Sequence, residues 1–235
     1  ETLPRLRELG VPIWVSVGGF AADEYAETCA ALDDVAAIEL NLSCPNVDEA
    51  PGSAAAIVAA CRAATGLPLY AKLSPAAWDL AEGARAVEAA GADGLSLVNT
   101  LRGLVLDERT LRPVLARGAG GYSGPALRPV ALAAVHACAS AVSIPIVGMG
   151  GVASGRDALD LIAVGASAVA LGTVLFGDPD APVRVRAELA AEAAARGFGD
   201  PLEARGIAQT SLQITVSESG NGNTKVPGNP PKVTA

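Results

Sequence analysis

Aromatic side chains, histidine and long apolar runs are all scarce in this sequence of 235 residues. Aromatic residues make up only 3% of the chain, although apolar residues make up 51%. The core must therefore be built from Ala, Val, Leu and Ile, which suits Ala-rich helices packed on parallel strands. The length fits one large domain better than two.

Residues that support metal or triad chemistry are also few. The single histidine, His136, lies in a helical pattern, so a Ser-His-Asp or Cys-His triad lacks a convincing base. The four cysteines form no CxxC pair and show no spacing suited to zinc or iron–sulfur ligation. Cys29, Cys61 and Cys138 lie among alanines and are expected to be core residues. The sequence therefore predicts no metal site.

Basic residues are in the minority. The chain has 17 Lys and Arg against 25 Asp and Glu, a net charge of -8, which disfavours a nucleic-acid partner. The longest uncharged stretch, residues 161–177, is interrupted by Gly, Ser and Thr and is too short to span a membrane. The start of the sequence shows no secretory pattern. We therefore expect a cytoplasmic protein that binds small molecules or other proteins.

Short β-rich runs alternate with longer Ala-rich helical runs along most of the chain, the pattern of βα units and a parallel sheet. The expected strands are Ile13–Val17, Ala37–Leu42, Leu69–Leu73, Gly94–Asn99, Ile144–Gly148 and Ala168–Leu171. The expected helices are Ala22–Leu32, Ser53–Thr65, Asp79–Ala90, Ala126–Ala141 and Ser154–Val164.

Six such units fall two short of the eight in a closed barrel. The simplest prediction is an α/β fold, a (β/α)8 TIM barrel that lacks its first two units, over residues 1–208. An open doubly wound sheet is the alternative, but no GxGxxG fingerprint follows the first strand. Residues 209–235 are rich in Gly, Asn, Ser and Pro and are expected to form a disordered or non-native tail.

The strand ends carry the chemistry, because barrel active sites gather at the C-terminal ends of the strands. Cys44 follows the second strand between Asn41 and Asn46, and Pro45 turns the chain out of the sheet. A thiol has a reference pKa of about 8.5, so modest stabilisation of the thiolate makes it a usable base or nucleophile. The alternative is a small buried cysteine in an ordinary βα turn.

Other strand ends are polar or glycine-rich. Lys72 lies in the third strand, where an ammonium is costly unless an anion or electron-rich ligand accepts its charge; the alternative is a side chain that reaches the rim. Asn99 and Thr100 follow the fourth strand. The turns at 148–151 and 171–173 precede helices, a usual site for phosphate in barrels. Together these groups fit an enzyme that uses flavin mononucleotide (FMN), with Cys44 removing a proton while a hydride passes to the flavin.

Several segments are similar to the dihydroorotate dehydrogenase family, over roughly Leu3 to Ala208. They are ELNLSCPNV (39–47), AKLSP (71–75), AGADGLSLVNTLRG (90–103), GGYSGPALRPVAL (120–132), PIVGMGGVASGRDAL (145–159) and GASAVALGTVLF (165–176). The resemblance implies an FMN-binding barrel that oxidises dihydroorotate to orotate in pyrimidine biosynthesis. The cysteine in SCPN is typical of class 1, and GGYSGPA resembles the class 1B branch, which passes electrons to NAD.

The resemblance also implies roles for individual residues. Cys44 matches the catalytic base. The implied substrate-binding residues are Asn41, Asn46, Asn99 and Thr100. The implied cofactor-binding residues are Asn41, Lys72, Val98, Gly124, Gly150, Gly151, Gly172 and Thr173. Two positions depart from the family pattern: Ser16 stands where this branch often has a flavin-contacting Asn, and Tyr122 where Leu is usual.

The class 1B resemblance implies a partner subunit that carries FAD and a 2Fe-2S cluster and relays electrons to NAD, and it implies a homo-oligomer. Two other interpretations stay open. One is a related FMN-dependent dihydropyrimidine dehydrogenase, for which the departure at Tyr122 leaves room. The other is a non-catalytic barrel fragment.

Overall fold

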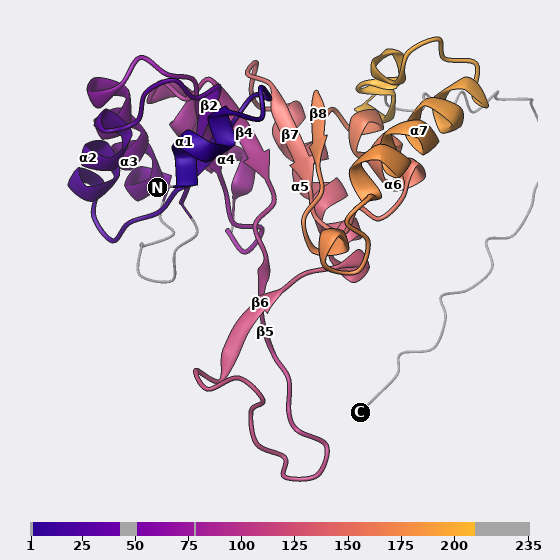
Figure 1. Cartoon of the computed structure of the whole chain (residues 1–235), viewed down its shortest axis with the longest axis horizontal. Helices are drawn as coiled ribbons and strands as arrows, with labels where there is room; N and C mark the ends of the chain where they lie inside the picture. Colours follow the sequence, from indigo (N-terminus) through magenta and orange to yellow (C-terminus); the bar gives the residue numbers. More distant parts are fainter. Residues whose placement is uncertain (1, 43–50, 78, 210–235) are drawn as a thin grey trace, which may run out of the picture.

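The main sheet has six parallel strands in the consecutive order β1-β2-β3-β4-β7-β8 (Figure 1). The computed structural model describes residues 2–42, 51–77 and 79–209. The strands are β1 (Trp14–Val17), β2 (Ala37–Asn41), β3 (Leu69–Lys72), β4 (Gly94–Leu97), β7 (Ile146–Met149) and β8 (Ala168–Ala170). A doubly wound sheet would reverse its strand order partway. The predicted α/β class with an incomplete barrel is therefore confirmed.

Helices alternate with these strands, as the apolar periodicity predicts. The α-helices are α1 (Thr2–Arg7), α2 (Ala22–Ala30), α3 (Pro51–Ala64), α4 (Leu80–Ala89), α5 (Arg128–Ala139), α6 (Gly155–Ala163) and α7 (Ala181–Ala194). Short 3-10 helices are η1 (Pro125–Leu127), η2 (Thr173–Phe176), η3 (Pro201–Ala204) and η4 (Ile207–Gln209). The predicted strand ends agree with the structure to within about two residues, and so do the ends of the five predicted helices, which correspond to α2, α3, α4, α5 and α6.

The core lies between the sheet and its helices. In β2, Ile38 and Leu40 are fully buried, while Glu39 and Asn41 alternate with them and so lie on the opposite face of the sheet. Cys29, Cys61 and Cys138 are buried in the same core, as expected from their alanine-rich surroundings. The helices thus cover one face of the sheet, and the other face is left to carry polar side chains.

A two-stranded antiparallel hairpin is inserted between β4 and α5 and projects away from the sheet (Figure 1). It consists of β5 (Leu101–Leu104) and β6 (Ala119–Tyr122). The hairpin was not predicted from the sequence, because Gly120 and Gly121 are poor strand formers and the two strands are far apart along the chain. Tyr122 is exposed on this hairpin.

The predicted tail begins at a residue that is well anchored. The Gln209 side-chain amide donates hydrogen bonds to the backbone oxygens of His136 (2.9 Å) and Val164 (2.8 Å). The rest of that prediction, residues 210–235, lies outside the described residues. Among the helices that the structure does describe, none combines the length and hydrophobicity that a bilayer crossing requires.

Close packing of α6 on α7 leads to a stability prediction. A methyl group at Gly155 would overlap the backbone of Glu188 and Leu189, whereas one at Gly83, within α4, would meet nothing within 4 Å. Gly155→Ala is expected to lower the free energy of unfolding by about 2–3 kcal/mol. Gly83→Ala, the matched control, should raise it by about 0.5–1 kcal/mol. Urea denaturation checks both, and equal effects at the two sites would contradict the packing described here.

Candidate active site

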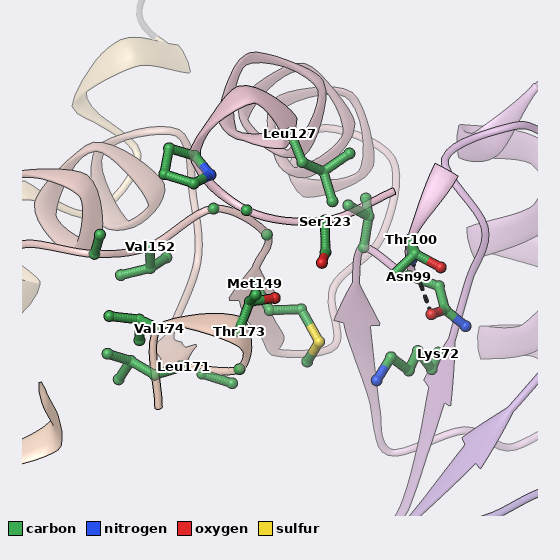
Figure 2. A pocket seen from close by; sticks show the side chains of 18 of the residues that line it. Lys72, Asn99, Thr100, Ser123, Leu127, Met149, Val152, Leu171, Thr173 and Val174 are labelled. Carbon is green, nitrogen blue, oxygen red and sulfur yellow. Dashed lines mark hydrogen bonds between the residues drawn. The ribbon is translucent and has the colours of Figure 1, made fainter. Parts of the chain in front are cut away.

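A cavity of about 460 Å³ lies at the C-terminal ends of β3, β4, β7 and β8 (Figure 2). Its volume is within the usual range for small-molecule and cofactor sites. Lys72, Asn99 and Thr100 lie on one side, and Val152, Leu171 and Val174 lie on the other. The predicted site residues that line it are Lys72, Val98, Asn99, Thr100, Gly124, Gly150, Gly151, Gly172 and Thr173.

Two asparagines, one at the end of β2 and one just after β4, are joined by a direct hydrogen bond across the end of β3, which lies between these strands. Asn99 Nδ2 donates to Asn41 Oδ1 at 2.9 Å, and the backbone N–H of Thr100 donates to Asn99 Oδ1 at 2.9 Å. The hydroxyl of Tyr25, from α2, donates to the backbone oxygen of Asn41 at 2.6 Å. The amide plane of Asn99 is therefore oriented before any ligand arrives. Asn41 supports it without lining the cavity.

Lys72 has a partner that the sequence reading did not identify. Its Nζ donates to Glu39 Oε1 at 3.1 Å, and both side chains are mostly buried, with 20% and 12% of their surface exposed. An anion does accept the charge, as the cost of burying an ammonium requires, but this anion belongs to the protein. Alternation in the sequence does indicate that Glu39 lies on the same face of β2 as Asn41, and so on the face that carries the site.

Unpaired backbone N–H groups gather at the glycine-rich end of the cavity. Within residues 2–42, 51–77 and 79–209, no hydrogen bond involves the backbone N–H of Gly150, Gly151, Gly172 or Thr173. Gly150 and Gly151 have φ values of 122° and 76°, which glycine adopts readily. Backbone N–H groups seek an acceptor, so this end of the cavity suits an anion such as phosphate.

The first turn of α6 differs from the expected phosphate site. The backbone N–H groups of Ala153 and Ser154 both donate to Asp157 Oδ2 at 3.0 Å, and Gly155 N–H donates to Glu188 Oε2 at 2.8 Å. The protein's own carboxylates therefore occupy these donors. The N–H groups left for an anion are those of the preceding turn, at Gly150 and Gly151, and of the turn before η2.

The middle of the cavity is apolar. Its wall includes Val98, Leu127 and Met149, of which the first two are buried. An anion-binding end, apolar walls and an ammonium at the opposite side match the phosphate, ring system and polar ring edge of FMN. The residues that are present therefore fit this cofactor. Leu127, Met149 and Glu39 lie within the segments that resemble the family, but they were not among the predicted site residues.

The predicted residues Cys44 and Asn46 lie outside the described residues. The other three cysteines can be assessed. Burial raises the pKa of the Cys61 thiol to about 12 and of the Cys138 thiol to about 12, and it also raises the pKa of Cys29. Thiolate is the reactive form, so these three thiols should be inert at neutral pH.

Thiol titration checks this inertness. At pH 8 a thiol with a pKa near 12 is ionised to only about one part in 10⁴. We therefore expect an aromatic disulfide reagent to react with at most one of the four cysteines in the folded chain and with all four in urea. Rapid reaction of two or more thiols in the folded chain would contradict the burial described here.

Comparison with known proteins agrees with the geometry of the cavity. The family model described as dihydroorotate dehydrogenase matches residues 1–192. The chain is 46% identical over 228 residues to the catalytic subunit of dihydroorotate dehydrogenase B (NAD(+)) of Trichlorobacter lovleyi, covering 93% of this chain and 72% of that protein. For the proteins of the same name from Halalkalibacterium halodurans and Geobacillus kaustophilus, identities are 46% over 187 residues and 44% over 189 residues. Those alignments cover 75% and 76% of this chain but only 61% and 60% of the relatives. This chain belongs to the dihydroorotate dehydrogenase family.

Proposed function

We propose that this chain carries the catalytic site for FMN-dependent oxidation of dihydroorotate to orotate in pyrimidine biosynthesis. The observation that carries the proposal is the convergence on one cavity of about 460 Å³ of Lys72, Asn99 and four backbone N–H groups that have no hydrogen-bond partner among the described residues. No single strand end would be specific, because each group is common in βα turns. Their arrangement around one apolar cavity is what favours a flavin nucleotide.

The cofactor would be held at both ends. The backbone N–H groups of Gly150, Gly151, Gly172 and Thr173 would bind its phosphate, and Val98 and Gly124 would border its ring. FMN supplies the two-electron acceptor for the substrate hydride. Lys72 would place its ammonium at the ring edge, where it stabilises the negative charge that accumulates on reduction.

The asparagine pair would orient the substrate. Dihydroorotate has a ring amide and imide whose planar donors and acceptors match carboxamide side chains. The Asn41–Asn99 hydrogen bond fixes one such side chain at the cavity wall, and Thr100 and Asn46 would add further contacts. Cys44 would take the proton from C5 of the substrate as the hydride leaves C6.

Electrons would leave through a second protein. The relatives are named as catalytic subunits of an NAD(+)-dependent enzyme. We propose that this chain likewise works with a subunit that carries FAD and a 2Fe-2S cluster, as a homo-oligomer in the cytoplasm. The three described cysteines are buried, and only Cys29 and Cys61 contact each other, whereas a 2Fe-2S cluster takes four ligands, so these thiols are unsuited to holding one.

Reconstitution tests the function. The full chain is titrated with FMN, and dihydroorotate is then added without oxygen while the visible absorbance of the flavin is followed. We expect stoichiometric FMN binding and rapid bleaching by dihydroorotate. Absence of FMN binding would refute the proposal, and binding without bleaching would favour the non-catalytic interpretation. Bleaching only by dihydrouracil would favour the related dihydropyrimidine dehydrogenase. The structure gives that alternative no support, since Tyr122 is exposed and does not line the cavity.

A further inference from the structure

The carboxylate of Glu39 contacts the ammonium of Lys72 at the edge of the 460 Å³ cavity. Glu39 lines both the 460 Å³ cavity and a second one of about 380 Å³ on the same face of the sheet, whereas Lys72 lines only the first. The second cavity is also lined by Ser16 and Ser96. Glu39 thus lies at the boundary between the two cavities, and the ammonium of Lys72 lies on the cofactor side of that boundary.

Two donors converge on one oxygen of Glu39. Lys72 Nζ donates to Oε1 at 3.1 Å, and Ser16 Oγ donates to the same atom at 3.0 Å. Ser16 is paired in register with Glu39, while Lys72 is paired with Asn41, one position further along the same face. The lysine side chain therefore leans back along the strand to reach the carboxylate.

No other described group is placed to hold the ammonium. The register partner of Lys72 on its other side is Ser96, whose buried Oγ has no hydrogen-bond partner within the described part of the chain. The only ion pair of Lys72 among these residues is with Glu39. The position of the ammonium is thus set from the β1–β2 side alone.

Position 72 has a lysine, although most basic residues of this chain are arginines. The chain contains three lysines, Lys72, Lys225 and Lys232, and arginine at every other basic position. Lysine is a compact point charge, whereas the guanidinium of arginine is planar and best suited to bidentate pairing. A single carboxylate oxygen on one side and a cavity on the other favour the compact ammonium.

We propose that Glu39 is a positioning residue of the flavin site: it anchors Lys72 through one carboxylate oxygen and offsets its charge toward the cavity. This inference rests on the proposed function. With Glu39 present, the pair is neutral overall, so Lys72 orients an electron-rich ring edge without a full net positive charge. Removing the carboxylate charge leaves the ammonium uncompensated, and an anionic reduced flavin then becomes more favourable.

The midpoint potential of bound FMN tests this role. Glu39→Gln is expected to raise the equilibrium constant for two-electron reduction about tenfold, which corresponds to about 30 mV. Glu88→Gln, which removes the same charge from α4 outside both cavities, is the matched control and should leave the potential unchanged. A purely structural role for Glu39 would change stability without moving the potential.

A double-mutant cycle shows whether Glu39 acts through Lys72. Because the two side chains are in contact, their effects should be non-additive. In a Lys72→Met background, Glu39→Gln should change the equilibrium constant less than threefold. A tenfold change in that background, or a change of less than twofold in the wild-type background, would overturn the proposal.

A measurement without cofactor separates this inference from the proposed function. In the full chain labelled with ¹⁵N-lysine, the Nζ signal of Lys72 can be assigned by its loss in Lys72→Met. We expect this ammonium to show slowed proton exchange that Glu39→Gln abolishes. An unchanged signal in Glu39→Gln would overturn the anchoring. If the chain failed to bind FMN but this signal behaved as expected, the proposed function would fall while the anchoring contact would stand.

Discussion

Replacing Cys44 by alanine is expected to slow the reduction of bound FMN by dihydroorotate by about 10²–10⁴-fold, the range for loss of a general base. Of the side chains in SCPN, only the thiol of Cys44 has a reference pKa close to neutral, about 8.5, whereas the Ser43 hydroxyl and the Asn46 amide do not ionise in this range. Binding of FMN and of orotate should persist, since neither depends on proton transfer. Stopped-flow absorbance gives the rate.

The matched control is Cys138→Ala. Cys138 is fully buried on α5, and its sulfur contacts the backbone oxygen of Leu80 at 3.8 Å, away from the cavity. This change should leave the reduction rate unchanged, although it removes a thiol of the same size from the core. A Cys44→Ala variant that keeps more than a tenth of the wild-type rate would show that another group takes the proton.

Replacing Gly151 by alanine is expected to weaken FMN binding by at least about 100-fold. Gly151 has φ of 76°, where an L-residue costs about 1–2 kcal/mol. Its methyl group would lie 2.7 Å from the backbone oxygen of Gly124 and 2.9 Å from the backbone nitrogen of Arg128. Both neighbours are backbone atoms, so the turn itself must move, and the N–H groups at Gly150 and Gly151 would move with it.

Gly177→Ala provides the comparison. Gly177 directly follows η2 and has φ of -103°, and a methyl group there would meet nothing within 4 Å. It should bind FMN like the wild-type chain in a fluorescence titration. Thermal unfolding without FMN should separate loss of the site from loss of the fold. If a folded Gly151→Ala chain bound FMN with wild-type affinity, the phosphate would not be held by this turn.

Local pattern was enough to locate most of the regular structure. Alternation in the run Ala37 to Leu42 and the 3.6-residue period of α4 depend on neighbours in the sequence, so both could be predicted. The β5–β6 hairpin could not, because its glycine-rich second strand is stabilised by pairing with a segment more than ten residues away. Strand pairing of that kind leaves no periodic signal within one strand.

The candidate site divides in the same way. Strand-end position identified Lys72, Asn99 and the glycine turns, and the structure brings them to one cavity. Position in the sequence could not identify the hydrogen-bond partners of these groups. Glu188 reaches Gly155 from a helix 33 positions away, and it is such contacts that decide which backbone N–H groups are left for a ligand.

The family, the alternation of strands and helices, and the residue types at each strand end can all be read from local order along the chain. Which charged side chains meet depends on how the strands pair in the folded chain. Strand register places Lys72 against Asn41 and leaves Glu39 within its reach, so an ammonium that the sequence required to have an anionic partner finds that partner within the protein. Alternation within β2 places Glu39 on the same face as Asn41, but the contact with Lys72 depends on the register between β2 and β3, which no pattern along one strand encodes.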